Sequence, residues 1–505
     1  MKTTKVRSFL VCFGVALVMG TTAPLAMADE EPDTSWTGGT DEWDADDPVN
    51  WSSGIPGDDD NAAISNGGTA TISGTGGDLV AGSLWLGASD DEALEGHVDH
   101  CGQRDLLVTD NLFLGKDFES DEVHNGSDGT LEISAGGVEV GSGGTGDLQV
   151  YGYGGWHHVI PPEEEGQEEQ YYWTPALGTV IQTAGAVTVH GDLLVKAKGG
   201  EASYTIDHET AELNVNGSGE SWIQISTDTE FDELLGLTSS AVLHLAQGEV
   251  TASNVVIGPS SHGGLLRQLG GEMHISGELL VGDLSSGDAR YMMISGTMEA
   301  GEITMEGGEF QQSGGDVTVS GTVGMAIGTG TTPTGRDASW EMTGGSLQAN
   351  EIIMGEYGDA TFTQSGTSPS VTVTGTLVVG NNVGSAETAT YSIAAGTLSA
   401  GKLFVGRHPT TGAFIQSGGT VAIGEMVLGD GPASSTTPDE ATYTLTGGQL
   451  TVTGTAWLAN NIVTATFTQS GTAEASFGGD VLLASSEMEE ETAEYSLSGD
   501  SAACI

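Results

Sequence analysis

One stretch of this sequence gathers side chains that can bind ligands. Residues 156–173 read WHHVIPPEEEGQEEQYYW, in which two adjacent histidines and a run of glutamates lie between aromatic residues. Imidazole and carboxylate groups are common metal ligands, and exposed aromatic rings offer flat apolar faces to sugars. We therefore treat the stretch as a candidate ligand-contact loop, and its contact residues are Trp156, His157, His158, Tyr171, Tyr172 and Trp173.

The same residues fit a plainer interpretation, an acidic surface loop whose aromatic side chains pack at its base. Successive side chains of a strand point to opposite faces, so two adjacent histidines rarely hold one ion together. This interpretation requires no ligand, and the sequence favours it over metal or glycan binding at residues 156–173.

Cofactor sites are otherwise scarce in the sequence. Acidic runs at 57–62 (GDDDNA) and 487–491 (EMEEE) can attract Ca²⁺. Neither run has the alternating Asp spacing of an EF-hand loop, and the Gly-Gly-x-Gly-x-Asp repeat of calcium-binding β-rolls is absent. We therefore predict no cofactor, with Ca²⁺ as a weak alternative and no metal ligands assigned.

Catalytic residues are equally hard to find. Glycan hydrolysis needs two carboxylates at a defined separation, and 71 acidic residues produce many chance pairs without a recurring motif. Exported β-helix enzymes that cleave acidic polysaccharides also need a basic residue at the substrate. Lys196 and Lys198 form the only close lysine pair, and the other basic residues are scattered at Arg104, Arg267, Arg290, Arg336, Lys402 and Arg407. We predict that the chain is not an enzyme.

The charge of the chain limits its partners. Twelve Lys and Arg residues stand against 71 Asp and Glu, which gives a formal net charge of −59. Nucleic acids and anionic membrane surfaces bind proteins through cationic patches, so we expect neither as a partner. The acidity suits solubility, cation binding or a salty environment, and composition does not separate these three.

The first 28 residues have the features of a secretory signal peptide. MKTTKVR is basic, FLVCFGVALVMG is apolar, and the segment ends Ala26-Met27-Ala28, a small-x-small cleavage pattern. The apolar run is too short to span a bilayer. We therefore predict cleavage before Asp29 and a secreted protein, extracellular or on the outer cell surface, that does not span the membrane.

The rest of the chain repeats itself. ATFTQSGT occurs at 360–367 and again at 465–472, with AFIQSGGT at 413–420 and EFQQSGGD at 309–316. The spacings between their equivalent glutamines are 52, 52 and 53 residues. A sister segment such as YTLTGGQL at 443–450 recurs halfway between them, so the repeat unit contains two half-units of about 26 residues.

Each half-unit alternates apolar and polar residues in three short stretches separated by glycines, the pattern of half-buried strands. In residues 442–459 the alternation puts one set of side chains on the inner face: Tyr443, Leu445, Leu450, Val452, Ala456 and Leu458. The same template applied upstream gives Leu266, Gln268, Met273, Ile275, Leu279 and Val281.

Three strands with glycine corners in every half-unit are typical of a parallel β-helix. One rung cannot bury its apolar face alone, whereas stacked rungs complete each other's hydrogen bonds. Glycine supplies the positive φ values that sharp corners require. We therefore predict an all-β fold, a right-handed parallel β-helix (solenoid) of three-strand rungs with glycine corners. A β-propeller would explain the 52-residue period but not its division into halves.

The recurring glutamine has two interpretations. It occupies the column where sister rungs carry Ile or Leu, so we expect it to point inward near a corner. There its amide can cap corner backbone groups or join a short amide ladder. The alternative is a ligand contact, and the sequence favours the structural role.

The segment before the first clear repeat is rich in tryptophan. Residues 35–64 contain Trp36, Trp43 and Trp51. The open end of a β-helix exposes unpaired strand edges, so this segment can serve as a cap, while stacking on sugars is the alternative. We predict three parts in the chain: a signal peptide at 1–28, a Trp-rich cap at 29–69, and β-helix repeats at 70–505 with the insertion at 156–173.

The opening SWTGGTDEW at 35–43 and the TFTQSG rungs resemble secreted bacterial repeat proteins of planctomycete type. Those proteins are similar to autotransporter passengers and autotransporter-associated β-strand repeat proteins. The resemblance covers nearly all of the chain after residue 28 and implies a cell-surface or extracellular location.

We therefore predict that this acidic rod is an adhesin-like structural scaffold without catalytic activity. Its expected partners are extracellular glycans or cell-surface components. The alternative is a carbohydrate-binding or polysaccharide-degrading β-helix protein.

Overall fold

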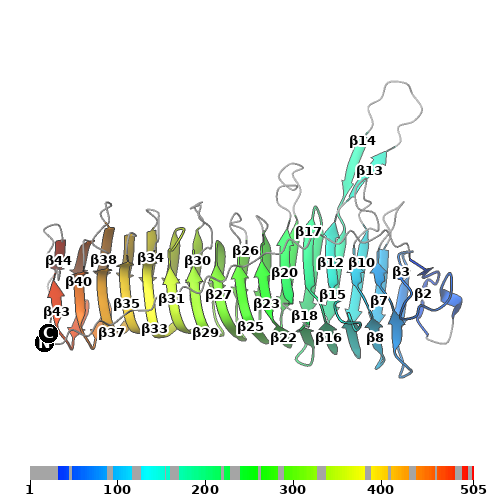
Figure 1. Ribbon diagram of the computed structural model, residues 1–505, viewed down its shortest axis with the longest axis horizontal. Helices are drawn as coiled ribbons and strands as arrows, with labels where there is room; N and C mark the ends of the chain where they lie inside the picture. Colours follow the sequence, from blue (N-terminus) through cyan, green and yellow to red (C-terminus); the bar gives the residue numbers. More distant parts are fainter. Residues whose placement is uncertain are drawn as a thin grey trace, which may run out of the picture.

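The strands of the chain stack into one elongated rod (Figure 1). The fold is taken from a computed structural model, in which the predicted signal peptide lies outside the described residues. The residues described are 32–44, 48–87, 95–115, 127–153, 155–159, 170–217, 221–227, 239–259, 263–282, 289–326, 337–381, 388–407, 411–430, 439–460, 463–483, 492–498 and 503–504.

The first strands of successive rungs form one parallel ladder, because each pairs with the first strands of the rungs before and after it. A strand spacing of about 4.8 Å makes this ladder about 80 Å long. Among the described residues it comprises 17 strands: β2 (Thr40–Glu42), β4 (Thr69–Ile72), β7 (Glu95–His100), β10 (Asp128–Ile133), β15 (Leu177–Gln182), β18 (Glu201–Ile206), β21 (Ser240–Leu245), β24 (Gly264–Gln268), β26 (Ala289–Met293), β28 (Gly308–Gln312), β30 (Ala338–Met342), β32 (Ala360–Gln364), β34 (Thr388–Ile393), β36 (Thr411–Gln416), β38 (Asp439–Leu445), β41 (Val463–Gln469) and β44 (Thr492–Leu497).

The second and third strands of the rungs form the other parallel sheet. Second strands that stand alone are β5 (Leu79–Ala81), β8 (Asp105–Val108), β11 (Gly137–Val140), β16 (Ala186–Val189), β19 (Glu212–Val215), β22 (Glu249–Ala252), β39 (Gln449–Val452), β42 (Glu474–Phe477) and β45 (Ala503–Cys504). Separate third strands are β1 (Thr34–Ser35), β3 (Ala62–Ile64), β6 (Leu84–Leu86), β9 (Leu112–Leu114), β12 (Leu148–Tyr153), β17 (Leu193–Lys198), β20 (Trp222–Thr227), β23 (Asn254–Ile257), β40 (Ala456–Asn460) and β43 (Val481–Leu483).

In the middle rungs the second and third strands merge into one longer strand. The merged strands are β25 (Glu272–Val281), β27 (Thr297–Met305), β29 (Asp316–Met325), β31 (Ser346–Met354), β33 (Ser370–Asn381), β35 (Thr397–Arg407) and β37 (Thr420–Asp430). This differs from the predicted three separate strands. Between Ile275 and Glu278 the ladder shifts register and continues, because a bulge-like irregularity bends a strand without ending it.

The inner faces of the rungs form one continuous apolar core. Every residue that the two sequence templates place inside is at most 2 % exposed: Tyr443, Leu445, Leu450, Val452, Ala456, Leu458, Leu266, Gln268, Met273, Ile275, Leu279 and Val281. Each strand pairs in parallel with its equivalent in the next rung, which excludes the radial blades of a propeller. The prediction of a parallel β-helix is confirmed.

The first corner of most described rungs contains a glycine with positive φ. Gly419 lies in the turn between β36 and β37 with φ of +68°, a conformation that side-chain-bearing residues rarely adopt. A Cβ atom at this position would lie 2.7 Å from the carbonyl oxygen of Gly396 in the preceding rung. The corner therefore requires glycine both for its backbone angle and for the close stacking of rungs.

The recurring glutamines are buried core residues that hold the corners. Gln364 Nε2 donates hydrogen bonds to the carbonyl oxygens of Pro369 at 2.9 Å and Thr397 at 2.8 Å. One amide thus joins the corner of its own rung to the start of the next rung's second strand. The expected capping role is confirmed, and the same arrangement recurs at Gln182, Gln268, Gln312 and Gln416.

At five glutamines of the described residues, the amide oxygen accepts a hydrogen bond from a tyrosine of the next rung. The hydroxyl group of Tyr391 donates to Gln364 Oε1 at 2.9 Å, and both side chains are fully buried. A rung with an inward Gln is therefore followed by a rung with an inward Tyr, which explains why the repeat spans two rungs. The equivalent pairs are Tyr204–Gln182, Tyr291–Gln268, Tyr443–Gln416 and Tyr495–Gln469.

One rung breaks this pairing. Trp340 stands where a tyrosine is expected after Gln312, and neither Gln312 Oε1 nor Trp340 Nε1 has a hydrogen-bond partner. The indole instead stacks on Phe310, with ring centroids 3.9 Å apart. It belongs to a column of stacked rings one rung apart: Tyr291, Phe310, Trp340, Phe362, Tyr391, Phe414, Tyr443, Phe467 and Tyr495.

The three tryptophans of the N-terminal segment lie against the first rungs. Trp36, Trp43 and Trp51 are at most 5 % exposed. Trp51 contacts both of the others edge-on, with ring centroids 5.2 and 4.9 Å apart, and η1 (Pro48–Asn50) immediately precedes it. Buried rings have no free face for a sugar, so this geometry supports a packing role for these residues.

Loss of one buried amide should destabilise the rod measurably. Gln364→Leu introduces an apolar residue of the kind that sister rungs already carry, but it leaves the Tyr391 hydroxyl without its acceptor and removes one hydrogen bond from each of the carbonyl groups of Pro369 and Thr397. We expect a loss of about 1–3 kcal/mol in the free energy of unfolding, measured by chemical denaturation. Combining it with Tyr391→Phe should cost less than the sum of the two single changes.

Gln312 provides the matched control for this experiment. Its Oε1 already lacks a donor, so Gln312→Leu removes fewer hydrogen bonds and should cost less than Gln364→Leu. Equal losses for the two variants would show that the tyrosine hydrogen bond contributes nothing.

Candidate functional site

The predicted ligand-contact loop is an antiparallel ribbon of two strands. β13 (Gly155–Val159) pairs with β14 (Gln170–Thr174), and the ribbon projects from one edge of the rod between β12 and β15 (Figure 1). The sequence predicted an acidic surface loop with its aromatic residues packed at its base. Aromatic residues at both ends of the insertion favour strand pairing, and this signal was available in the sequence.

The register of the ribbon brings the six candidate residues together in pairs. Trp156 lies opposite Trp173, His157 opposite Tyr172, and His158 opposite Tyr171. Directly opposite residues of an antiparallel pair have Cβ atoms about 5 Å apart. The candidate residues therefore share one element that projects from the rod, and ligand contact at these positions stays a prediction.

The lysine pair singled out in the sequence is surrounded by acidic groups. Lys196 and Lys198 lie on β17, and Lys196 is mostly buried. Burial lowers the pKa of Lys196, while the carboxylates of Asp192 and Asp147 oppose that shift. Lys196 therefore balances local negative charge and offers no open binding site for an anionic substrate.

These acidic groups hold the rungs in register. Asn111 Oδ1 accepts the backbone N–H of Asp147, Asp147 Oδ1 accepts that of Asp192, and Asp192 Oδ1 accepts that of Trp222, each at 2.8 Å. Three successive side chains thus cap the backbone of the rung that follows. Asp147 and Asp192 are close carboxylates, but their geometry serves the corner of the solenoid.

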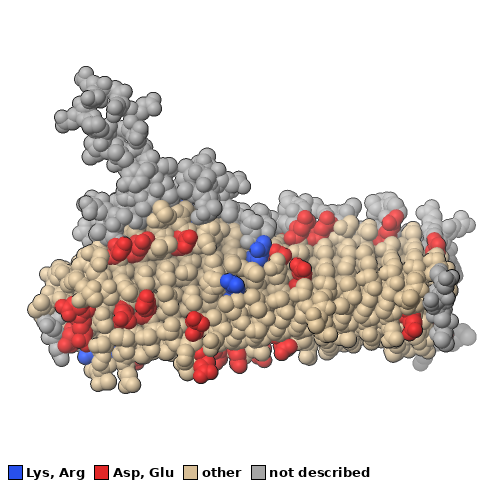
Figure 2. Space-filling model, turned by 180° about the vertical axis from the view of Figure 1, so that it is seen from behind, with Lys and Arg blue, Asp and Glu red and all other residues tan. Residues whose placement is uncertain are grey.

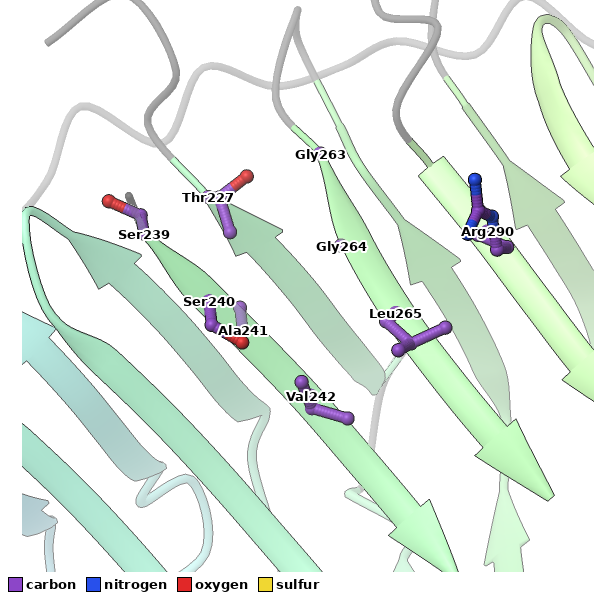
Figure 3. A pocket seen from close by; sticks show the side chains of 9 residues that line it. All are labelled: Thr227, Ser239, Ser240, Ala241, Val242, Gly263, Gly264, Leu265 and Arg290. Carbon is purple, nitrogen blue, oxygen red and sulfur yellow. The ribbon is translucent and has the colours of Figure 1, made fainter. Parts of the chain in front are cut away.

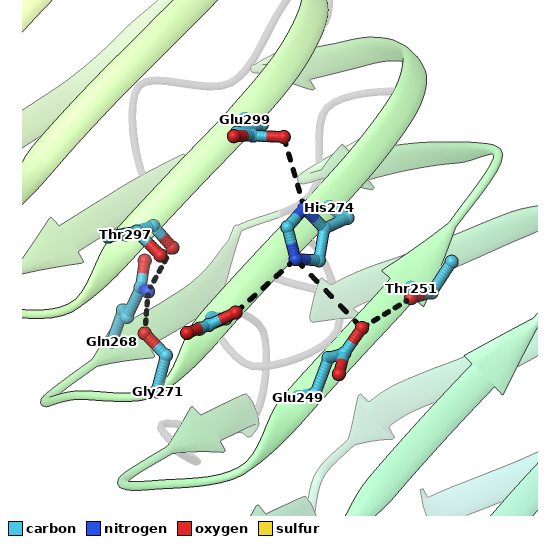
Figure 4. Close-up of polar contacts among 8 residues, drawn as sticks. Glu249, Thr251, Gln268, Gly271, His274, Thr297 and Glu299 are labelled. Atoms are coloured by element: carbon cyan, nitrogen blue, oxygen red, sulfur yellow. Dashed lines mark hydrogen bonds and ion pairs between the residues drawn. The ribbon is translucent and has the colours of Figure 1, made fainter.

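The outer face of the second strands carries an imidazole ringed by carboxylates (Figure 4). His274 Nε2 lies 3.6 Å from Glu272 and 3.9 Å from Glu249, and its Nδ1 lies 3.3 Å from Glu299. These residues come from β22, β25 and β27, whose parallel register places them in neighbouring rungs. The sequence did not reveal this cluster, because Glu249 and Glu299 lie about 25 residues from His274 and only rung stacking brings them to it.

A shallow hollow of about 470 Å³ adjoins the His274 cluster. Its polar lining consists of Thr251, Ser276, Glu299, Thr318 and Ser320, together with His274 itself. An imidazole, a carboxylate and several hydroxyl groups on a flat strand face can hydrogen-bond a polar ligand.

The described part of the chain contains neither a metal-site cluster nor a membrane-spanning helix. No group of three or more His, Cys, Asp or Glu in the described residues has the arrangement of a metal site. In the 57–62 run, Asp60 Oδ2 accepts the backbone N–H of Gly57 at 2.9 Å, and 487–491 lies outside the described residues. No helix in the described ranges has the length and apolar character needed to cross a membrane.

Comparison with known proteins gives no relative for this chain. No family model, no curated protein and no solved structure matches it.

Four carboxyl groups of the described residues have a raised pKa, so their ionised form destabilises the fold and protonation should remove this cost. Burial is the largest cause of the raised pKa at each of them: Asp128, Asp192, Glu302 and Glu356. At Glu356 burial is the only cause. A carboxyl group whose pKa is raised on folding favours the folded state most at low pH, and this contribution is lost as the pH rises through the folded pKa.

Glu356→Gln should therefore raise the melting temperature at pH 7, where the buried carboxyl is ionised in the wild type. The gain should shrink toward pH 4, where the wild-type group is protonated when folded. Glu341→Gln removes the same charge from an exposed position and should give a smaller change at pH 7. Thermal unfolding at pH 4, 5.5 and 7 tests this, and a gain of equal size at all three values would contradict it.

Proposed function

We propose that this protein is an exported structural scaffold with an adhesin-like role at the cell surface or in the extracellular space, without catalytic activity. The observation that carries the proposal is the shape of the molecule. One continuous core runs through the described rungs, and the β13–β14 ribbon projects sideways from the rod. Such a rod holds a contact element at a set distance from its ends.

The distribution of chemistry supports a scaffold role. The inward residues serve packing, and the carboxylates of Asp147 and Asp192 hold backbone groups. Outward side chains and the insertion are therefore the parts left to meet a partner. Glycans or cell-surface components are the partners that we propose for the ribbon, because its six paired residues combine aromatic rings with imidazoles.

A second candidate function is carbohydrate binding or cleavage by the rod itself. The hollow beside His274, with its hydroxyl groups and carboxylate, is the observation that favours it. Release of reducing sugar or unsaturated product from a polysaccharide by the purified protein would establish cleavage and end the non-enzymatic proposal.

Removal of the ribbon tests the adhesin-like role. Replacing residues 155–174 by a short Gly-Asn-Gly turn should leave the thermal stability of the rod nearly unchanged, because β13 and β14 pair only with each other among the described strands. Binding to a glycan array or to whole cells should fall at least tenfold. A control variant shortened at 431–438, in another connection between third and first strands, should bind normally.

Export can be tested directly. Expression of the full chain in a secreting bacterial host should yield extracytoplasmic protein whose N-terminal residue is Asp29. Edman sequencing or mass spectrometry of the purified protein reads this terminus. Retention of Met1 on cytoplasmic protein would contradict the proposed location.

A further inference from the structure

Two of the few basic residues lie side by side on the outer face of the first strands. Arg267 is on β24 and Arg290 is on β26, the next strand of the ladder, where Arg290 pairs with Leu265. Arg290 lies one strand away from Arg267 and two residues along from its pairing position, so the two Cα atoms are about 8 Å apart. Two arginine side chains are long enough to bridge that distance. Figure 2 shows basic side chains near the middle of one face, with acidic side chains close beside them.

Arg267 has no acidic partner among the described residues. No carboxylate of the described residues forms an ion pair with it, although the chain carries 71 acidic residues. Its Nε is buried without a hydrogen-bond acceptor. A guanidinium group presents several donors in a fixed plane, so an unpaired one leaves its charge and its donors available to an anion.

The other groups that face Arg267 add positive charge or none. His244 is its partner on β21, and Met292 is its partner on β26. Burial lowers the pKa of His244, and the charge of Arg267 lowers it further. On the neighbouring strand, Glu309 Oε2 lies 2.9 Å from Arg290 Nε.

An open hollow of about 320 Å³ adjoins Arg290 (Figure 3). Its lining includes the side chains of Thr227, Ser239 and Ser240 and the backbone of Gly263 and Gly264. Ser240 is exposed at the start of β21, and Arg290 is exposed on β26. A ligand with one negative group and several hydroxyl groups would match this arrangement of donors.

We propose that Arg267 and Arg290 together bind one oxyanion, the carboxylate of a uronic acid or a sulfate ester, on a glycan whose neighbouring sugar occupies the hollow. The site uses none of the residues of the β13–β14 ribbon, so it stands independently of the role proposed for that element. Glu309 engages the Nε edge of Arg290, which leaves the terminal nitrogens of that guanidinium for the ligand.

The charge of the whole molecule limits the ligand to few negative groups. A net charge of −59 repels a dense polyanion at long range, whereas a single oxyanion is attracted mainly by the two adjacent guanidinium groups. Nucleic acid is therefore a poor fit. Arg267 and Arg290 are 23 residues apart in the sequence, and strand pairing places them on adjacent strands.

Titration calorimetry of the purified full chain with three oligosaccharides tests the site. The probes are trigalacturonate for a carboxylate, a chondroitin sulfate tetrasaccharide for a sulfate ester, and uncharged cellotetraose. We expect at least one anionic probe to bind tenfold or more tightly than cellotetraose, and the two anionic arms show which group is preferred. Arg267→Gln and Arg290→Gln should each weaken that binding about tenfold or more.

Lys402→Gln is the matched control, because it removes one positive charge from an ion pair with Glu425 on the other sheet. It should leave binding unchanged. The proposal is wrong if neither anionic probe exceeds cellotetraose, or if the arginine variants bind like Lys402→Gln.

Glu309→Gln decides the question if the arginine variants fail to fold. It frees Arg290 from its carboxylate partner and should tighten binding of the anionic probe by about two- to fivefold. Misfolding does not tighten binding, so a gain supports the site. Unchanged or weaker binding by a folded Glu309→Gln variant would overturn it.

Discussion

Every rung of this protein depends on the rungs above and below it to bury its inward side chains. A single turn of three short strands has an apolar inner face but too little area to remove it from water. Stacking equivalent strands in parallel register solves this, because each strand edge is paired and each inward side chain packs on its counterpart. Side chains on the inner face must therefore fit against their counterparts in neighbouring rungs, whereas side chains on the outer face are not restricted in this way.

Hydrogen bonding across rungs then determines the length of the repeat. A glutamine in the core would be costly if its amide were unpaired, and the corner carbonyls together with a tyrosine hydroxyl satisfy it. The donor tyrosine belongs to the following rung, so the pattern needs two rungs to repeat. At Trp340 the pairing fails, and stacking between Phe310 and Phe362 replaces it.

Functional chemistry in such a molecule arises on its outer surfaces. Strand ladders place residues from different rungs about 4.8 Å apart, and this brings His274 beside three glutamates and Arg267 beside Arg290. The insertion adds an element of a different kind, the β13–β14 ribbon. A partner would therefore meet either rows of side chains on a flat face or a projecting hairpin.

The local sequence pattern is sufficient to predict the architecture and the inner face. Alternation with period two and glycine at the corners are local signals, and they place Tyr443, Leu450 and Leu458 in the core. Which outward residues become neighbours depends instead on how the rungs stack. Register relates residues about 25 positions apart, and insertions of variable length shift that count from rung to rung. The acidic ring around His274 and the arginine pair were therefore visible only once the rungs were stacked.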